Sequence, residues 1–196
     1  MTSFHRYERD LIINNRELNY KGIFRFPELI STINKVISER GYEKNEKKSE
    51  ELVTQDGKRT LIELRPFKQK TNYVMLMIKI RLILNSVTEI DQEVAGTTHK
   101  FSQGDILVVF DSWLLTDYYK RWGLQPLVFF LKGIINKYIY TWPLEGGLPG
   151  ELKSDTAAIY AAIKKLLNSY KHEVDGKVSE QDVMQDVAKD IALEDN

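Results

Sequence analysis

The sequence contains no cysteine among its 196 residues. This absence excludes disulfides, a thiol nucleophile, and zinc or iron–sulfur sites built on thiolates. The sequence also lacks a run of about 18 uncharged apolar residues and a start with the pattern of a secretory signal, so we expect neither a membrane-spanning helix nor export. The formal net charge is zero, with 28 basic and 28 acidic residues, which gives no overall attraction to nucleic acid. We therefore expect a cytoplasmic protein.

Catalytic motifs are absent as well. The three histidines, His5, His99 and His172, lie far apart in the sequence, and no two of them have the spacing of metal ligands on one helix. No glycine-rich phosphate-binding loop, dinucleotide-binding fingerprint or Gly-x-Ser-x-Gly elbow occurs. We therefore predict no catalytic residue, no cofactor and no metal site, and we rank enzymatic activity below a binding function.

The neutral charge is unevenly distributed. Residues 172–196 carry eight acidic and two basic residues, which leaves 26 basic and 20 acidic residues in the rest of the chain. No acidic residue occurs between Glu63 and Glu89, although five basic residues do. This distribution is explained by a solvated basic face beside an independent acidic tail, by an anionic partner, or by a tail that folds back.

The first half of the chain predicts a strand, a helix and a hairpin. Residues 1–16 show no clean period and predict a loose arm, whereas Tyr20–Phe24 predict a short strand. Apolar residues over 29–37 recur with the period of one helix face, between a proline suited to the first turn and a glycine suited to the C-terminal cap. Asp56-Gly57 between extended runs is typical of a two-residue hairpin, and Pro66 ends the second strand.

The middle of the chain predicts the long strands of a sheet. Residues 73–84 alternate strictly with period two, which predicts one long strand. Further extended runs cover 87–94 and 97–101, with a turn between them. A second turn at 102–105 leads to the run 106–115, which is apolar on both faces and so predicts a central strand.

Helices follow at 126–140 and 154–171. The predicted fold class is therefore α+β, with a curved antiparallel sheet of five to seven strands packed on helices. The predicted organisation is a loose arm (1–16), a single domain (17–171), and an acidic, partly helical tail (172–196).

This order of elements resembles the helix-grip arrangement of the polyketide-cyclase and lipid-transfer superfamily. The resemblance covers roughly residues 17–171, and it implies a sheet curled around a long terminal helix. The chain also resembles a group of archaeal proteins in its early strand Tyr20–Phe24, its aromatic stretch Asp117–Trp122 and the following helix Phe129–Tyr138. That likeness implies a fold and no activity.

We predict non-catalytic binding of a hydrophobic small molecule or lipid between the sheet and the helices. The predicted lining combines inward-facing strand residues with residues of the 126–140 helix. It consists of Leu76, Ile78, Ile80, Val108, Phe110, Asp111, Phe130 and Ile134. Asp111 stands inside an apolar strand, where it either faces a cavity with a raised pKa or bonds to a tyrosine or to an arginine such as Arg81.

The alternative is a peripheral membrane-surface or protein-interaction module. Ten of the 21 aromatic residues, including all three tryptophans, lie within 110–142, interspersed with lysine and arginine. This composition suits both core packing and contact with an anionic membrane surface. The predicted contact residues are Trp113, Trp122, Phe129 and Trp142. Tyr73, Lys79 and Arg81 lie on one face of a predicted strand, a pattern typical of surfaces that stack on nucleic-acid bases and contact phosphates. The apolar residues among them disfavour nucleic-acid binding. The pattern indicates no particular oligomeric state.

Overall fold

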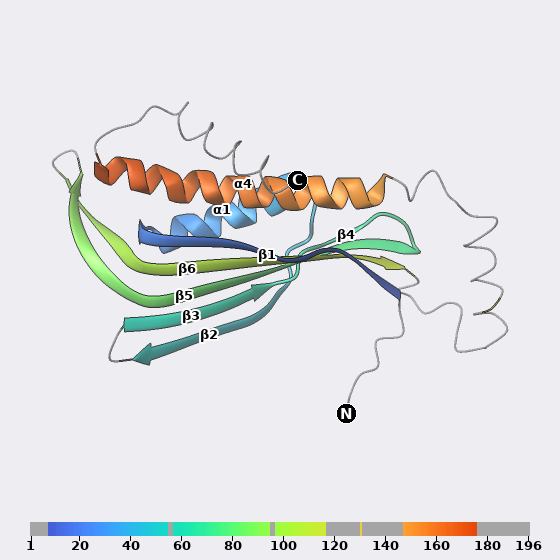
Figure 1. Cartoon of the computed structure of the whole chain (residues 1–196), viewed down its shortest axis with the longest axis horizontal. Helices are drawn as coiled ribbons and strands as arrows, with labels where there is room; N and C mark the ends of the chain where they lie inside the picture. The colour runs from blue at the N-terminus through green and yellow to red at the C-terminus, as the bar shows by residue number, and fades with distance from the viewer. Residues whose placement is uncertain (1–7, 55–56, 95–96, 117–129, 131–146, 176–196) are drawn as a thin grey trace.

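The computed structural model describes residues 8–54, 57–94, 97–116, 130 and 147–175. In this part of the chain, six antiparallel strands form a curved, open sheet, and two helices lie on one of its faces (Figure 1). The strand order is β1-β6-β5-β3-β2, and β4 pairs with β5 beside that path. The elements are β1 (Glu8–Phe24), α1 (Phe26–Glu39), β2 (Glu46–Thr54), β3 (Gly57–Leu64), β4 (Phe67–Gln69), β5 (Val74–Val94), β6 (Thr97–Thr116) and α4 (Leu148–Asp175). The predicted α+β class is confirmed.

The two longest strands, β5 and β6, run side by side for most of their length. Each was expected to be two strands separated by a break, and that expectation is wrong. The break in β5 is a bulge, because the register shifts between Asn85 and Thr88 and Ser86 adopts a φ of 51°. Gly104 lies opposite, where a Cβ atom would come within 2.9 Å of the Asn85 carbonyl oxygen. Close approach of the two backbones therefore explains the glycine, and no turn is needed there.

The first strand is also longer than its pattern indicates. β1 begins at Glu8, so residues 8–16 belong to the sheet and are not a loose arm. Its register with β6 shifts between Leu11 and Ile13 and again between Ile13 and Arg16, and Asn15 has a φ of 53°. These irregularities interrupt the alternation of side chains, which is why the sequence shows no period in this stretch.

The hairpin between β2 and β3 and the first helix follow the predictions. Thr54 pairs with Gly57, whose φ is 122°, and Pro66 separates β3 from β4. α1 has Pro27 in its first turn. The helix ends at Glu39, and Gly41, with a φ of 73° and an N–H that donates to the Ser38 carbonyl oxygen, follows in its C-terminal cap.

The terminal helix is longer than predicted. α4 begins at Leu148 and ends at Asp175, so residues 148–150 belong to its first turn. Proline and glycine are tolerated there because the first N–H groups of a helix have no partner within the helix. The expected helix at 126–140 lies outside the described residues except for Phe130.

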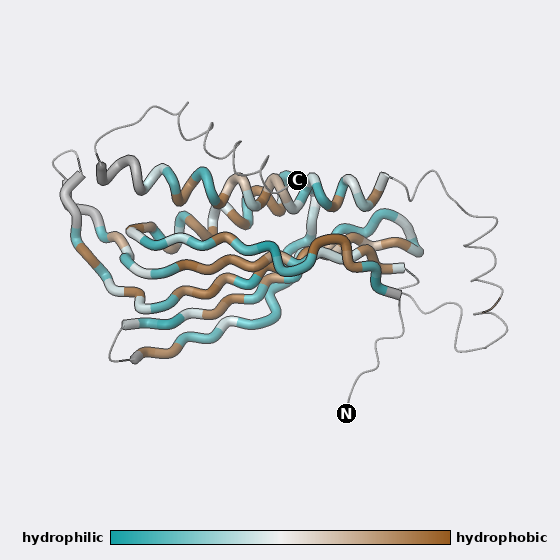
Figure 2. The backbone as a smooth tube through the Cα atoms, viewed as in Figure 1, coloured by the Kyte–Doolittle hydropathy of each residue, from teal (hydrophilic) through white to brown (hydrophobic). Residues whose placement is uncertain are grey.

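The core lies between the sheet and the two helices. Hydrophobic residues recur along the central strands and along both helices (Figure 2), and the three buried residues of α1 are Leu29, Ile33 and Ile37. α4 contributes the stripe Leu152, Ile159, Ile163 and Leu167, each at most 1% exposed. The Tyr170 hydroxyl of α4 donates a hydrogen bond to the Glu28 carboxylate of α1. The two helices therefore form one cover over the sheet.

Candidate functional site

We call the face of the sheet that α1 and α4 cover the inner face, and its opposite the outer face. Successive residues of a strand point to opposite faces, so the register decides which side chains meet. Ile80 pairs with Phe110, Leu82 with Val108, and Leu76 with Leu114. Five residues of the predicted lining lie together on the inner face, and each is 0% exposed. These five are Leu76, Ile78, Ile80, Val108 and Phe110.

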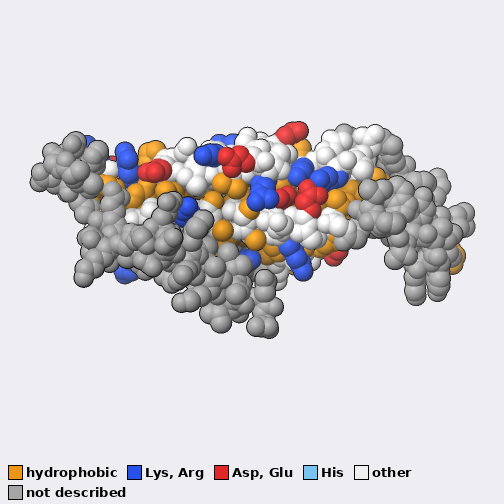
Figure 3. All heavy atoms as spheres, turned by 90° about the horizontal axis from the view of Figure 1, so that it is seen from above, with side chains coloured by type: hydrophobic (Ala, Val, Ile, Leu, Met, Phe, Trp, Pro, Cys, Tyr) orange, Lys and Arg blue, Asp and Glu red, His pale blue; other side chains and the backbone are white. Residues whose placement is uncertain are grey.

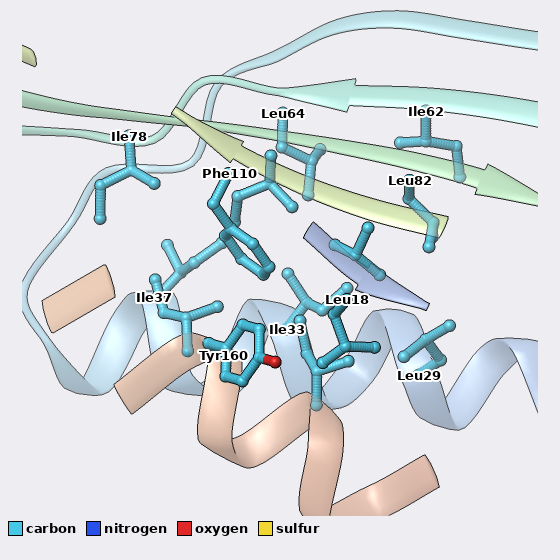
Figure 4. Packing of buried hydrophobic residues seen from close by; sticks show 14 of the residues in the cluster. Leu18, Leu29, Ile33, Ile37, Ile62, Leu64, Ile78, Leu82, Phe110 and Tyr160 are labelled. Carbon is cyan, nitrogen blue, oxygen red and sulfur yellow. The ribbon is translucent and has the colours of Figure 1, made fainter. Parts of the chain in front are cut away.

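Side chains from the helices close this inner layer from the other side. The rings of Phe110 and Tyr160 are 5.9 Å apart at an interplanar angle of 59°, and they point toward one another between the sheet and α4 (Figure 4). Ile33 and Ile37 of α1 reach the same layer. The predicted lining residues therefore make up the hydrophobic core of the molecule.

A few polar groups interrupt this apolar layer on β6, α4 and β1. Ser112 lies opposite Ile78 on the inner face and is 0% exposed. Its Oγ has no hydrogen-bond partner among the described residues. The Thr156 hydroxyl, also on a fully buried residue, donates to the Leu152 carbonyl oxygen at 2.8 Å. The Ser112 hydroxyl is thus a buried polar group whose hydrogen-bonding capacity is unused by the described part of the protein.

An arginine of β1 also lies beside this layer. Arg16 lies opposite Phe110 in the pairing of β1 with β6, and its guanidinium carbon is 4.4 Å from the centroid of the Tyr160 ring. Because α4 and β6 run in opposite directions (Figure 1), Thr156 lies one turn from Tyr160 in the direction of Ser112. Sequence reasoning missed Ser112 and Arg16. The alternation of residues 106–115 places Ser112 on the face of Phe110, but the β1 irregularities concealed the position of Arg16.

Asp111 does not line this layer, which corrects the predicted set. It points to the outer face because it follows Phe110 in the strand. Its Oδ1 accepts a hydrogen bond from the backbone N–H of Asn15 at 2.8 Å. Its Oδ2 lies 3.5 Å from the Arg81 guanidinium and 4.0 Å from the Lys79 ammonium. The predicted bond to Arg81 is confirmed, and the carboxylate holds the irregular part of β1 against β6.

The surroundings of Asp111 form a charged band across the outer face. The band consists of Glu63, Arg65, Lys79, Arg81 and Asp111. Glu63 Oε1 lies 2.6 Å from Arg65, and its Oε2 lies 3.8 Å from Lys79. Two carboxylates, from the strands on either side of β5, thus offset three cations, all of which come from the stretch of the sequence that lacks acidic residues. Each cation of the band therefore lies within 4.0 Å of one of its two carboxylates.

Beside the charged band lies an outer apolar patch, built from the ends of β1, β5 and β6 together with β4. In the register, Met77 pairs with both Trp113 and Phe67, Leu11 pairs with Trp113, and Met75 pairs with Leu115. Leu11 is 46% exposed and Leu115 is 3% exposed; the other four residues are half-buried. Of the predicted contact residues, the structure therefore places Trp113 on the outer face.

The remaining predicted residues divide into two groups. Phe130 is 67% exposed, so its side chain does not join the buried layer. Ile134, Trp122, Phe129 and Trp142 lie outside the described residues.

Ionic side chains gather where α4 begins. This ion cluster consists of Arg40, Lys68, Lys70, Glu151 and Asp155. Glu151 Oε1 lies 2.8 Å from the Lys68 ammonium and 2.6 Å from that of Lys70, and Asp155 lies 3.4 Å from Arg40. Seen from the side of the helices, basic and acidic side chains lie next to one another among apolar ones (Figure 3). The cluster ties the first turns of α4 to the end of α1 and to β4.

The cluster also shifts proton affinities. Burial opposes ionisation of Glu151, but hydrogen bonds from Lys68 and Lys70 outweigh it and lower the pKa of its carboxyl. Burial and the neighbouring Asp155 carboxylate raise the pKa of the Tyr42 phenol. Their surroundings therefore hold Glu151 as a carboxylate and Tyr42 as a neutral phenol, which suits a structural role.

Within the described residues, no set of three or more histidine, aspartate and glutamate side chains is arranged to hold a metal ion. None of the helices described is both long enough and apolar enough to cross a membrane. Comparison with protein-family models, with curated proteins and with solved structures finds no match for this chain.

Proposed function

We propose that this protein binds a hydrophobic small molecule or lipid, without catalysis, between the inner face of the sheet and the helices α1 and α4. The observation that carries the proposal is the unpartnered Ser112 hydroxyl inside an otherwise apolar layer. Binding sites for apolar ligands combine a hydrophobic lining with a small number of placed polar groups. A ligand oxygen at this point would satisfy the hydroxyl, while its apolar part would replace contacts between side chains.

The way α4 is held supports access to this layer. α4 contacts β1 and α1 extensively, and it contacts β5 least. Its first turns are fixed by the ion cluster, which lies at the edge of the sheet and not over its centre. The helix can therefore separate from β5 without breaking a sheet hydrogen bond.

Native mass spectrometry of the full chain tests the proposal. We expect a mass above that of the chain alone, either as isolated or after incubation with diphenylhexatriene, a neutral apolar probe. Denaturing organic solvent should remove the additional mass. A spectrum with the mass of the chain alone, even after incubation with excess probe, would contradict the proposal.

The outer apolar patch supports a second candidate function, in which the protein contacts a membrane surface or another protein. The supporting observation is the 46% exposure of Leu11 beside the half-buried Trp113. Flotation with vesicles of neutral and of anionic phospholipid tests the membrane version. Binding that is weakened by Trp113→Ala and unchanged by Leu52→Ala, an exposed residue of β2, would support it. Absence of flotation with both vesicle types would exclude it.

A further inference from the structure

We propose that two copies of this chain pair through their β2 strands, antiparallel and centred on Ser49, and so join their sheets into one. This inference goes beyond the proposed function, because it concerns the edge of the sheet and not its inner layer. It starts from the place of β2 in the fold. β2 is the last strand in the order β1-β6-β5-β3-β2, and among the described residues it pairs with β3 alone.

β2 is accessible to a partner along its whole length. Every residue from Glu46 to Val53 is exposed, and the strand lies at the edge of the sheet away from α1 and α4 (Figure 1). Two of its apolar residues, Leu52 and Val53, are 60% and 76% exposed. An edge strand presents backbone N–H and C=O groups with which a further strand can pair. A second chain can therefore extend the sheet here without displacing any described element.

The charges of β2 favour a second copy as that further strand. The stretch centred on Ser49 reads Lys47-Lys48-Ser49-Glu50-Glu51, so two positive residues precede the serine and two negative residues follow it. Antiparallel pairing with Ser49 opposite Ser49 brings Lys48 of each copy opposite Glu50 of the other. Opposite charges at directly opposed positions stabilise a strand pair. The contact is self-complementary, as an interface with two-fold symmetry requires.

The alternation of side chains limits the registers that compete with this one. Directly opposed residues of two paired strands point to the same face of the sheet, so a two-fold axis between two copies of β2 must pass through a residue position. An axis at Lys48, Glu50 or Glu51 places that charge opposite itself, which is destabilising. An axis at Leu52 brings neither Lys48 nor Glu50 opposite a charge within the described part of β2. Of these centres, Ser49 alone pairs unlike charges.

The pairing is short, so we expect a weak dimer. The register of β2 with β3 shifts between Glu46 and Lys48, and this bulge interrupts the ladder on either side of the axis. Lys48 and Glu50 lie on the regular part, where their charged groups are 2.8 Å apart within one copy. In the dimer two such pairs form a network of four charges, which stabilises more than an isolated surface pair does. We expect a dissociation constant of about 10–100 µM at low salt.

Analytical ultracentrifugation of the full chain at about 5–500 µM tests the proposal, and we expect a reversible equilibrium between monomer and dimer. Lys48→Glu and Glu50→Lys, each alone, place like charges across the axis, and each should weaken self-association at least about tenfold. A mixture of these two variants should associate again, because the reversed charge of each then lies opposite an unlike charge of the other. The double variant Lys48→Glu/Glu50→Lys should dimerise as the unaltered chain does.

Lys35→Glu is the matched control, since it reverses the charge of an exposed lysine on α1, and it should leave the dimer unchanged. Circular dichroism verifies that each variant is folded. A full chain that stays monomeric over the whole range would overturn the inference. A dimer that is indifferent to both single charge reversals, or a mixture that associates no better than either variant alone, would overturn it as well. Each of these results leaves the proposed function intact, because that function is tested by ligand binding.

Discussion

The two faces of β5 and β6 are made by the same strands and differ in almost every physical property. On the inner face, Ile78, Ile80 and Phe110 are 0% exposed and contact the helices. On the outer face, their sequence neighbours Lys79 and Asp111 are joined to carboxylates or cations of adjacent strands. The comparison shows that the alternation of side chains, and not the composition of a segment, decides which residues form the core and which form a surface.

The largest expected effect is on the free energy of unfolding, when one isoleucine on each face of β5 is replaced by alanine. Ile80→Ala should lower the free energy of unfolding by about 2–5 kcal/mol, because it leaves a cavity in the buried layer. Ile83→Ala, on the half-buried outer face of the same strand, should cost about 1 kcal/mol. Urea unfolding of both variants measures the difference. Equal losses would show that the faces do not differ as described.

The outer face has its own stabilising contact at Asp111. Asp111→Ala should cost about 1–3 kcal/mol, because the Asn15 N–H loses its acceptor and Arg81 loses its nearest carboxylate. Asp105→Ala is the matched control on the same strand, since Asp105 makes an exposed ion pair with Lys21 within the described part of the chain, and its loss should cost less than about 0.5 kcal/mol. Similar urea midpoints for the two variants would argue against the role of Asp111 in holding β1.

Much of this arrangement is predictable from the sequence. The strict alternation over 73–84 places Ile78 and Ile80 on one face and Lys79 on the other, and the structure agrees. The same rule applied to 106–115 separates Asp111 from Phe110, although the predicted lining combined them. Long strands with one apolar face leave little freedom in register, because a shift of one residue would bury the charged row.

What could not be predicted depends on contacts between distant segments. At the Ser86 bulge, β5 passes close to Gly104 of β6, and a turn and a bulge use the same residue types. The irregular stretch of β1 is held by Asp111, 96 positions away from Asn15. The start of α4 at Leu148 is fixed by the lysines of β4 and its flank, which contact Glu151. Local patterns contain none of these relations.

A smaller effect is expected at Tyr20, a buried residue of the inner face whose hydroxyl donates to the Ile23 carbonyl oxygen at 2.7 Å. Burial raises the pKa of Tyr20 to about 12 from an ordinary value of 10.0. The unfolded chain therefore loses this proton first, and the stabilisation that Tyr20 provides below pH 10 is lost as the pH rises toward 12. Urea unfolding of Tyr20→Phe across this range should show a shallower fall in stability than the unaltered protein. Parallel curves would contradict the assignment.

The smallest effect is expected at the ion cluster, which lies at the edge between the two faces. The lowered pKa of Glu151 means that its carboxylate stabilises the fold above pH 4.5, and that this contribution is lost as the pH falls through the folded-state pKa. Glu151→Gln should cost about 1 kcal/mol or less near pH ~7 and nothing measurable near pH ~2. Glu39→Gln, which changes an exposed side chain of α1, controls for the loss of a helix carboxylate. A cost for Glu151→Gln that does not depend on pH would contradict the ionic role.

The most direct test of the central claim, that the inner layer is where the protein binds an apolar ligand, is a fluorescence titration with diphenylhexatriene on three proteins. These are the unaltered chain, Ile80→Phe on the inner face and Ile83→Phe on the outer face, each shown by circular dichroism to be folded. Because an added ring takes up space in a packed layer, we predict saturable binding to the unaltered chain and to Ile83→Phe, and at least about tenfold weaker binding to Ile80→Phe. Equal affinity of the two variants, or no saturable signal from the unaltered chain, would contradict the claim.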